Sequence, residues 1–173
     1  MFKSMKLMLT ACAMGLAVVS AIAAYAQNPA YTCTLPSGEN VPILVDTTLQ
    51  NVAVARRNEQ GQRTIVINPN VMAVFQPATR WFWLAHECAH QQLGHTLGNF
   101  GPDREQQADC YAAHQLVKNH QMDADDLRAI EQDISKLGGD KKAYLPGPAR
   151  AYAIDECVVK AVQEIQAGQD GND

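Results

Sequence analysis

The sequence predicts an α+β fold in which a small antiparallel sheet, built around a hairpin, packs against about four helices. Three observations lead to this prediction. Short apolar runs between residues 32 and 68 are typical of strands. After Asn68, apolar residues recur at helical spacing. The chain has 173 residues, enough for a single domain with its own core. A run of strands followed by a run of helices favours the α+β class over an alternating α/β fold.

The expected sheet is drawn from three segments. Residues 41–45 form an apolar run, and residues 52–54 and 64–67 flank the polar, glycine-containing stretch RRNEQGQR. Two apolar runs around such a stretch predict a hairpin. The sequence Asn-Pro-Asn at residues 68–70 then ends the last strand.

The first two helices are bounded by start and stop signals. One is expected from Pro77 to Leu93, because Gly94 follows its last apolar residue. The second is expected to start after Pro102, with Asp103 as N-cap and Gln106 as its capping-box partner three residues on.

Two more helices follow. The third is expected to begin at Asp123 and to end at the glycine pair 138–139, and the fourth to open at Pro148, which suits a first helical position. Each carries an apolar stripe at helical spacing: Leu127, Ile130, Ile134 and Leu137 in one, Ile154, Val158, Val162 and Ile165 in the other.

The first 26 residues have the features of a signal peptide. Residues 1–6 carry two lysines and no acid, residues 7–24 are uncharged and mostly apolar, and Ala24-Tyr25-Ala26 is a small-x-small cleavage pattern. We therefore expect an exported protein, periplasmic or secreted. Its domain would span residues 27–167, and the polar residues 168–173 would be a disordered tail.

Two other interpretations of the first 26 residues are less favoured. The stretch Leu9-Thr10-Ala11-Cys12 is similar to a lipoprotein cleavage box, but the apolar run before its cysteine is too short. An uncleaved membrane anchor would need roughly 18 apolar residues, and the apolar run nearly reaches that length. The cleavage site makes the anchor the less favoured outcome, so no stable membrane insertion is expected after signal cleavage.

Charge and cysteine content narrow the classes of partner. The chain has 14 basic and 18 acidic residues, and two of the basic ones, Lys3 and Lys6, belong to the leader. An acidic surface repels phosphate backbones, so nucleic acid is not an expected partner. Four cysteines follow the leader and none forms a CxxC pair, which predicts two disulfides rather than a zinc ribbon: Cys33, Cys88, Cys110 and Cys157.

The stretch His86-Glu87-Cys88-Ala89-His90 fits the pattern HExxH. Each helical residue turns the side chain by about 100°, so the two histidines lie about 40° apart and one turn along the axis. Two imidazoles at this spacing can bind one Zn²⁺, with Glu87 beside the metal-bound water. Cys88 lies about 200° from His86, on the far side of the helix.

A third ligand is expected from the second helix. The long zincin pattern would need glycine at position 93 and histidine at 96, and the chain has Leu93 and Thr96, so His95 is out of register. Glu105 and Asp109 instead share one helical face, just past the break GNFGPD. Glu105 would complete a His-His-Glu set, and Asp109 would accept the N–H of a ligating histidine.

The motif HExxHxxxxH, followed by ExxAD from Glu105 to Asp109, resembles the gluzincin metallopeptidases, in particular the CAAX-prenyl-protease-like branch and its small soluble exported relatives. The resemblance implies that His86, His90 and Glu105 bind zinc and that Glu87 is the general base. It matches Arg150, in LPGPARAYAI, to a downstream arginine that would help to hold the oxyanion. Leu145 stands where the histidine of that family's His-Pro pair is expected.

The predicted function is therefore that of a zinc metalloendopeptidase with a minimal zincin-like domain, hydrolysing a polypeptide substrate. The substrate is expected to lie antiparallel to an exposed edge strand, for which residues 64–67 are the candidate. The alternative is an inactive zinc- or polypeptide-binding module on the same fold, and a third possibility is a disulfide-stapled helical domain without metal.

Four cysteines allow three pairings. Because Cys88 points away from the metal face that would meet the second helix, a bridge from Cys88 to Cys110 would be strained. This favours the pairs Cys33 with Cys88 and Cys110 with Cys157.

Overall fold

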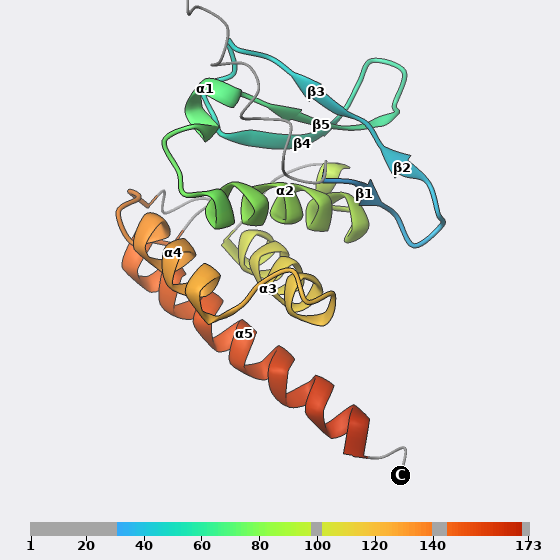
Figure 1. Ribbon diagram of the computed structural model, residues 1–173. Coiled ribbons are helices and arrows are strands. Elements are labelled where there is room, and N and C mark those ends of the chain that lie inside the picture. The colour runs from blue at the N-terminus through green and yellow to red at the C-terminus, as the bar shows by residue number, and fades with distance from the viewer. Residues whose placement is uncertain (1–30, 98–101, 140–144, 171–173) are drawn as a thin grey trace, which may run out of the picture. The chain divides into compact units, whose positions relative to one another are not determined.

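The computed structural model describes residues 31–97, 102–139 and 145–170, and these residues form a small α+β domain (Figure 1). The described part contains two small sheets, one of two strands and one of three, together with five α-helices and one short 3-10 helix. The predicted class is confirmed. The predicted signal peptide, residues 1–26, lies outside the described residues.

The strands follow one another in the first part of the chain. β1 and β2 pair antiparallel, while β3, β4 and β5 form the larger sheet in the order β3-β5-β4. Their bounds are Cys33–Thr34 for β1, Asn40–Val41 for β2, Ile43–Val45 for β3, Ala53–Arg57 for β4 and Arg63–Ile67 for β5.

The predicted hairpin is confirmed as β4 and β5, which pair antiparallel with Ala55 opposite Ile65. The sheet is nevertheless mixed, because β3 runs parallel to β5 with Leu44 opposite Val66. The prediction that residues 64–67 form an exposed edge is wrong: β5 is the central strand. Thr64, Ile65 and Val66 are all buried, as expected for a strand that is paired along both edges.

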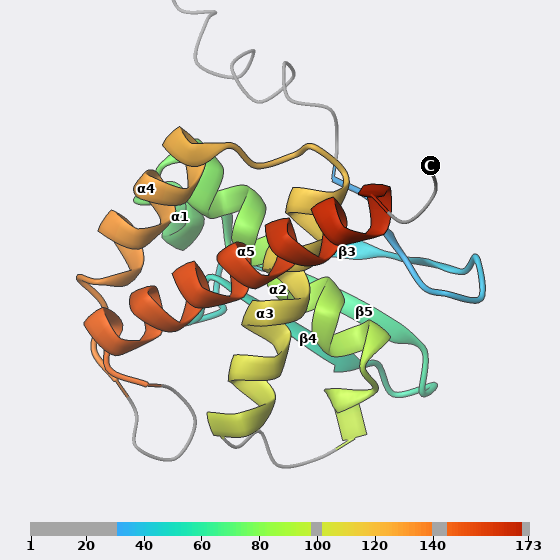
Figure 2. The same ribbon diagram turned by 90° about the horizontal axis from the view of Figure 1, so that it is seen from below.

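The five helices are α1 (Pro69–Met72), α2 (Pro77–Gln92), α3 (Pro102–Lys118), α4 (Ala124–Ile134) and α5 (Gly147–Asp170). α2 lies in the middle, with the strands on one side and α3, α4 and α5 on the other (Figure 1). Seen from below, α5 crosses α3 on the side away from the sheet (Figure 2).

Alanines line the contact between α2 and α3. Ala85 and Ala89 on α2 are at most 4% exposed, and Ala108 and Ala112 on α3 at most 1%. Side chains this small let two helix axes come close together. Because the two helices lie close together, an acidic side chain on α3 can reach the histidines on α2.

The boundaries of α2 depend on other parts of the chain. Its N-cap residue, Gln76, makes no side-chain cap, and the carboxylate of Asp133 on α4 accepts hydrogen bonds from the Gln76 backbone N–H at 2.8 Å and from the Thr79 hydroxyl at 2.9 Å. The helix ends at C-cap Leu93. Gly94 follows with φ of +75°, a left-handed conformation that favours glycine.

The predicted boundaries of the other helices are confirmed only in part. α4 begins after the N-cap Asp123 as predicted, with a capping box completed by Asp126. α3 begins at Pro102, so Asp103 lies in its first turn and is not the N-cap. α5 runs from Gly147 to Asp170, so the predicted tail is helical up to Asp170 because the glycine at 168 does not stop the helix.

Two disulfides tie the layers together, in the pairing that the sequence favoured. Cys33–Cys88 joins β1 to α2 with a Cα–Cα distance of 5.5 Å, and Cys110–Cys157 joins α3 to α5 with one of 5.0 Å. None of the helices in the described part of the chain has the length and apolar character needed to cross a membrane.

Candidate metal centre

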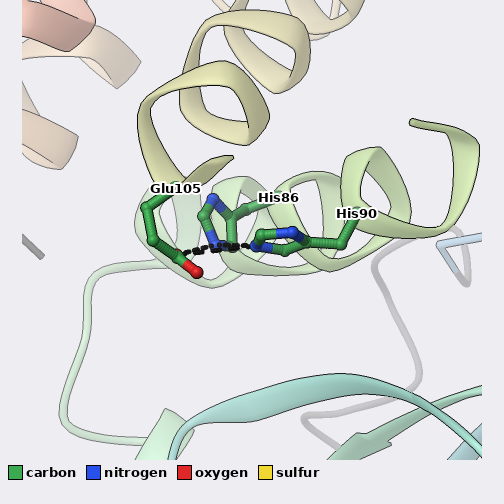
Figure 3. A group of neighbouring side chains, drawn as sticks. All are labelled: His86, His90 and Glu105. Atoms are coloured by element: carbon green, nitrogen blue, oxygen red, sulfur yellow. Dashed lines mark hydrogen bonds and ion pairs between the residues drawn. The ribbon is translucent and has the colours of Figure 1, made fainter. Parts of the chain in front are cut away.

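α2 presents the HExxH residues toward the interior of the domain. His86 is 1% exposed, His90 2% and Glu87 8%. One helical turn separates the two histidines, and their Nε2 atoms lie 3.1 Å apart. The predicted common direction of the two imidazoles is confirmed (Figure 3).

Glu105 reaches the same point from the first turn of α3. Its Oε2 atom lies 3.2 Å from Nε2 of His86 and 3.5 Å from Nε2 of His90. Figure 3 shows the three side chains converging from the two neighbouring helices. The residues predicted as the metal ligands are therefore brought together by the fold.

The spacing of these three atoms suits a metal ion. Two ligand atoms bound to a tetrahedral zinc ion at about 2.0–2.1 Å lie roughly 3.3–3.4 Å apart. The observed distances of 3.1, 3.2 and 3.5 Å fall around that value. His86, His90 and Glu105 thus form a buried group that could hold a metal ion.

The chemistry of the donors supports the same conclusion. Oε2 of Glu105 is buried and accepts no hydrogen bond of regular geometry from the described residues. If both imidazoles present unprotonated Nε2 atoms, this buried carboxylate oxygen has no donor, and the two lone pairs that face it add to the cost. A cation shared by the three atoms would relieve both.

Asp109 contacts the ring nitrogen of His86 that does not face Glu105. Its Oδ1 atom lies 2.8 Å from Nδ1 of His86, one helical turn after Glu105 on α3. A carboxylate in this position fixes the proton on Nδ1 and leaves Nε2 free for a metal. The predicted orienting role of Asp109 agrees with this geometry.

Arg150, at the start of α5, binds Asp109 from the other side. Its Nε and Nη2 atoms each donate a hydrogen bond of 2.8 Å to the Asp109 carboxylate, and its guanidinium lies 4.9 Å from the ring centre of Trp83. Burial alone would raise the pKa of Asp109, but the charges of Arg150 and His86 lower it to about 2. Arg150 therefore holds Asp109, which in turn positions the His86 ring. Direct contact between Arg150 and an oxyanion stays a prediction.

The electrostatics around the two histidines are dominated by acidic groups. Burial acts to lower the pKa of His86, but the nearby carboxylates of Asp109, Glu105 and Glu87 raise it to about 9. Burial acts to raise the pKa of Glu105, and its contacts with His86 and His90 lower it to about 2. Surroundings that favour a proton on an imidazole also favour a metal cation at the same place.

Glu87 links α2 to the edge strand β4. Its Oε2 atom accepts a hydrogen bond of 2.6 Å from the backbone N–H of Ala55, and burial raises the pKa of its carboxyl. Ala55 pairs with Ile65, whose own N–H donates to Pro42 on the opposite side of β5. The Ala55 N–H accordingly points outward from the sheet, toward α2, which carries two members of the metal group formed by His86, His90 and Glu105.

His95 is not part of the metal group, as the register of the sequence predicted. It lies in the 3-10 helix η2 (His95–Leu97), and its Nδ1 atom is 3.1 Å from Nδ1 of His90. No pattern in the sequence indicated this contact. The signal that could have found it is Gly94, because a left-handed glycine after a helix turns the chain back toward the last turn.

Comparison of the chain with models of protein families, with curated proteins and with solved structures gave no match in any of the three. The functional conclusion therefore depends on the geometry and chemistry of the site itself.

Proposed function

We propose that the protein is a zinc-dependent metalloendopeptidase of the gluzincin type, exported to the periplasm or secreted, which hydrolyses polypeptides. The observation that carries the proposal is the convergence of His86, His90 and Glu105 on one point, with Glu87 on the same helix. A purely structural metal site would have no use for a carboxylate beside an incomplete ligand set.

The donor set supports zinc as the ion. Two imidazole nitrogens and one carboxylate oxygen are a combination found in catalytic zinc sites, where three protein ligands leave one position for water or substrate. Calcium and magnesium prefer sites built from oxygen atoms alone, and His86 and His90 supply nitrogen.

The residues around the metal group would divide the work of hydrolysis. Bound Zn²⁺ would supply a Lewis acid that activates a water molecule and polarises a peptide carbonyl. Glu87 would take the proton from the attacking water and deliver it to the leaving amine. Asp109 would hold the His86 ring in the tautomer that presents Nε2, and Arg150 would hold Asp109.

The polypeptide substrate would lie along β4. This strand is an edge of the sheet, it packs against α2, and the Ala55 N–H points toward Glu87. A peptide that pairs antiparallel with β4 would bring its backbone beside the general base. β4 thus replaces residues 64–67 as the proposed substrate strand.

Export is supported by the two disulfides, because such bonds persist in oxidising compartments. The acidic balance of the chain argues against nucleic acid as a partner. We propose no membrane-inserted state for the mature protein.

A second candidate is a zinc- or polypeptide-binding module without catalysis. The burial of the site favours it: His86, His90 and Glu105 are at most 4% exposed, so a substrate carbonyl would need local opening to approach the metal. Intact Glu87 favours the enzyme instead.

Metal analysis combined with a cleavage assay separates these candidates. The purified protein would be tested for bound zinc and for cleavage of an unfolded, fluorescently labelled protein, with and without a chelator, and after zinc is added back. Chelator-sensitive cleavage restored by zinc supports the peptidase. Zinc without cleavage supports the binding module, and a protein that binds no zinc contradicts both the peptidase and a zinc-binding module.

Glu105→Gln provides the matched control, because it removes the acidic ligand while keeping the side-chain size. It should lose zinc and cleavage together. Zinc and cleavage that both survive in this variant would contradict the role of Glu105 as a ligand, whereas cleavage without zinc would come from a contaminating peptidase.

A further inference from the structure

His95 and His90 meet through a pair of ring nitrogens that the metal group does not use. Nε2 of His90 faces His86 and Glu105, and its Nδ1 lies 3.1 Å from Nδ1 of His95. His95 is 7% exposed, so this contact is shielded from water. A hydrogen bond in such surroundings has a strong effect on where the proton resides.

The fold creates this contact by reversing the chain directly after α2. Leu93 is the C-cap of the helix, and Gly94 takes a left-handed φ of +75°. η2 then begins at once with His95, and the two rings come to lie 5.2 Å apart between centroids. A residue with a Cβ atom would be strained at Gly94, so the position of His95 depends on that glycine.

The position of the proton follows from the metal group. If Nε2 of His90 gives its lone pair to a metal, the ring proton must be on Nδ1. Nδ1 of His90 then donates, and Nδ1 of His95 has to accept. His95 must therefore carry its own proton on Nε2, which fixes the tautomers of both rings.

Gln107 on α3 supports the same assignment. It forms a side-chain hydrogen bond with His95. An amide oxygen that accepts the remaining N–H of His95 would leave Nδ1 as the acceptor for His90. Gln107 lies two residues after Glu105, so the helix that supplies the acidic ligand also steadies the support of His90.

We propose that His95 is a positioning residue for the metal site, which accepts the Nδ1 proton of His90 and so directs Nε2 of His90 to the ion. The proposal rests on the metal binding put forward under the proposed function. The Nδ1 atoms of the two histidines then have different acceptors. His86 has the carboxylate of Asp109, which is paired with Arg150, and His90 has the neutral imidazole of His95.

The charges at the site explain why the acceptor behind His90 is a neutral imidazole. The carboxylates of Glu87, Glu105 and Asp109 carry up to three negative charges, which Arg150 and a bound Zn²⁺ would balance. A further buried anion behind His90 would be costly to desolvate. An imidazole accepts the same hydrogen bond without adding a charge.

The test compares zinc affinity, measured by competition with a chromophoric chelator, in three variants and the wild type. His95→Leu removes the acceptor and should weaken zinc binding by roughly 10- to 100-fold, the usual effect of losing such a support. His95→Asn places an amide oxygen near the position of Nδ1 and should recover most of the affinity. His114→Leu is the control: this half-buried histidine on α3 contacts Glu164 and should leave the affinity unchanged.

A second measurement does not depend on the folding of any variant. With ¹⁵N-labelled histidine in the zinc-loaded wild type, the spectra should show His90 protonated at Nδ1 and His95 protonated at Nε2. A proton on Nδ1 of His95 would overturn the proposal, as would full zinc affinity in a folded His95→Leu protein. Failure of the wild type to bind zinc would instead overturn the proposed function.

Discussion

The guanidinium of Arg150 donates two hydrogen bonds of 2.8 Å to the carboxylate of Asp109, across 41 residues of chain. Both side chains are only 6% exposed. Since Asp109 also lies 2.8 Å from His86, one buried ion pair connects the start of α5 to the metal group on α2. The arrangement makes the candidate metal site sensitive to how α3 and α5 are packed.

Arg150→Met tests this connection. Removing one partner of a buried ion pair leaves an uncompensated charge, so the free energy of unfolding should fall by about 3–5 kcal/mol. Zinc affinity should fall as well, because Asp109 is no longer held against His86. Chemical denaturation and chelator competition measure the two effects. Lys160→Met, at an exposed position on the same helix, should change stability by no more than about 0.5 kcal/mol.

Glu87→Gln should separate metal binding from hydrolysis. The amide keeps the shape of the side chain and an oxygen for the Ala55 N–H, so zinc content and fold should be unchanged. Loss of a general base should lower kcat/KM by roughly 10²- to 10⁴-fold. Glu59→Gln, in the exposed hairpin turn, is the matched control. Substantial activity in the Glu87 variant would remove this residue from the mechanism.

Asp133→Asn should weaken the attachment of α4 to the start of α2. The carboxylate accepts hydrogen bonds from Gln76 and Thr79, and replacing it with an amide should cost about 1–3 kcal/mol near neutral pH. Denaturation curves of variant and wild type give this difference directly.

The difference in stability between the wild type and Asp133→Asn should depend on pH. Burial acts to raise the pKa of Asp133, but its hydrogen bonds with Gln76 and Thr79 outweigh burial and lower it below its usual value. A lowered folded-state pKa gives stability that is fully present above the unfolded value of about 3.9 and lost as the pH falls through the folded value. The advantage of the wild type over Asp133→Asn should therefore shrink below about pH 4. A difference that stays constant down to pH 2 would contradict this account.

The two disulfides should differ in their response to a thiol reductant. Cys33 and Cys88 are at most 3% exposed, whereas Cys110 and Cys157 are half-buried and line an open cavity between α3 and α5. Alkylation and mass mapping at increasing thiol concentration should show Cys110–Cys157 opening first. The double variant Cys110→Ala, Cys157→Ala should lose up to about 4 kcal/mol of stability by the chain-entropy estimate for a loop of 47 residues. Earlier opening of Cys33–Cys88 would contradict the predicted order.

The sequence by itself determined the local features of this protein. His86 and His90 share a face because they are one helical turn apart, and Asp123 starts α4 because its side chain can cap the turn that follows it. The hairpin follows from the polar stretch between two apolar runs. Glu105 could be proposed as a ligand because its spacing to Asp109 repeats the same helical rule on the next helix, and the fold places it beside His86 and His90.

The tertiary structure decided the features in which distant segments meet. The central place of β5 requires the parallel pairing with β3, which no local pattern encodes. α5 continues past Gly168 to Asp170, which the polar composition of the last residues did not indicate. The ion pair between Arg150 and Asp109 joins residues that are 41 positions apart in the sequence. The contact by which Asp133 caps α2 at Gln76 spans 57 positions. Such contacts are selected by how whole elements pack, since burial and charge pairing act across space and not along the chain.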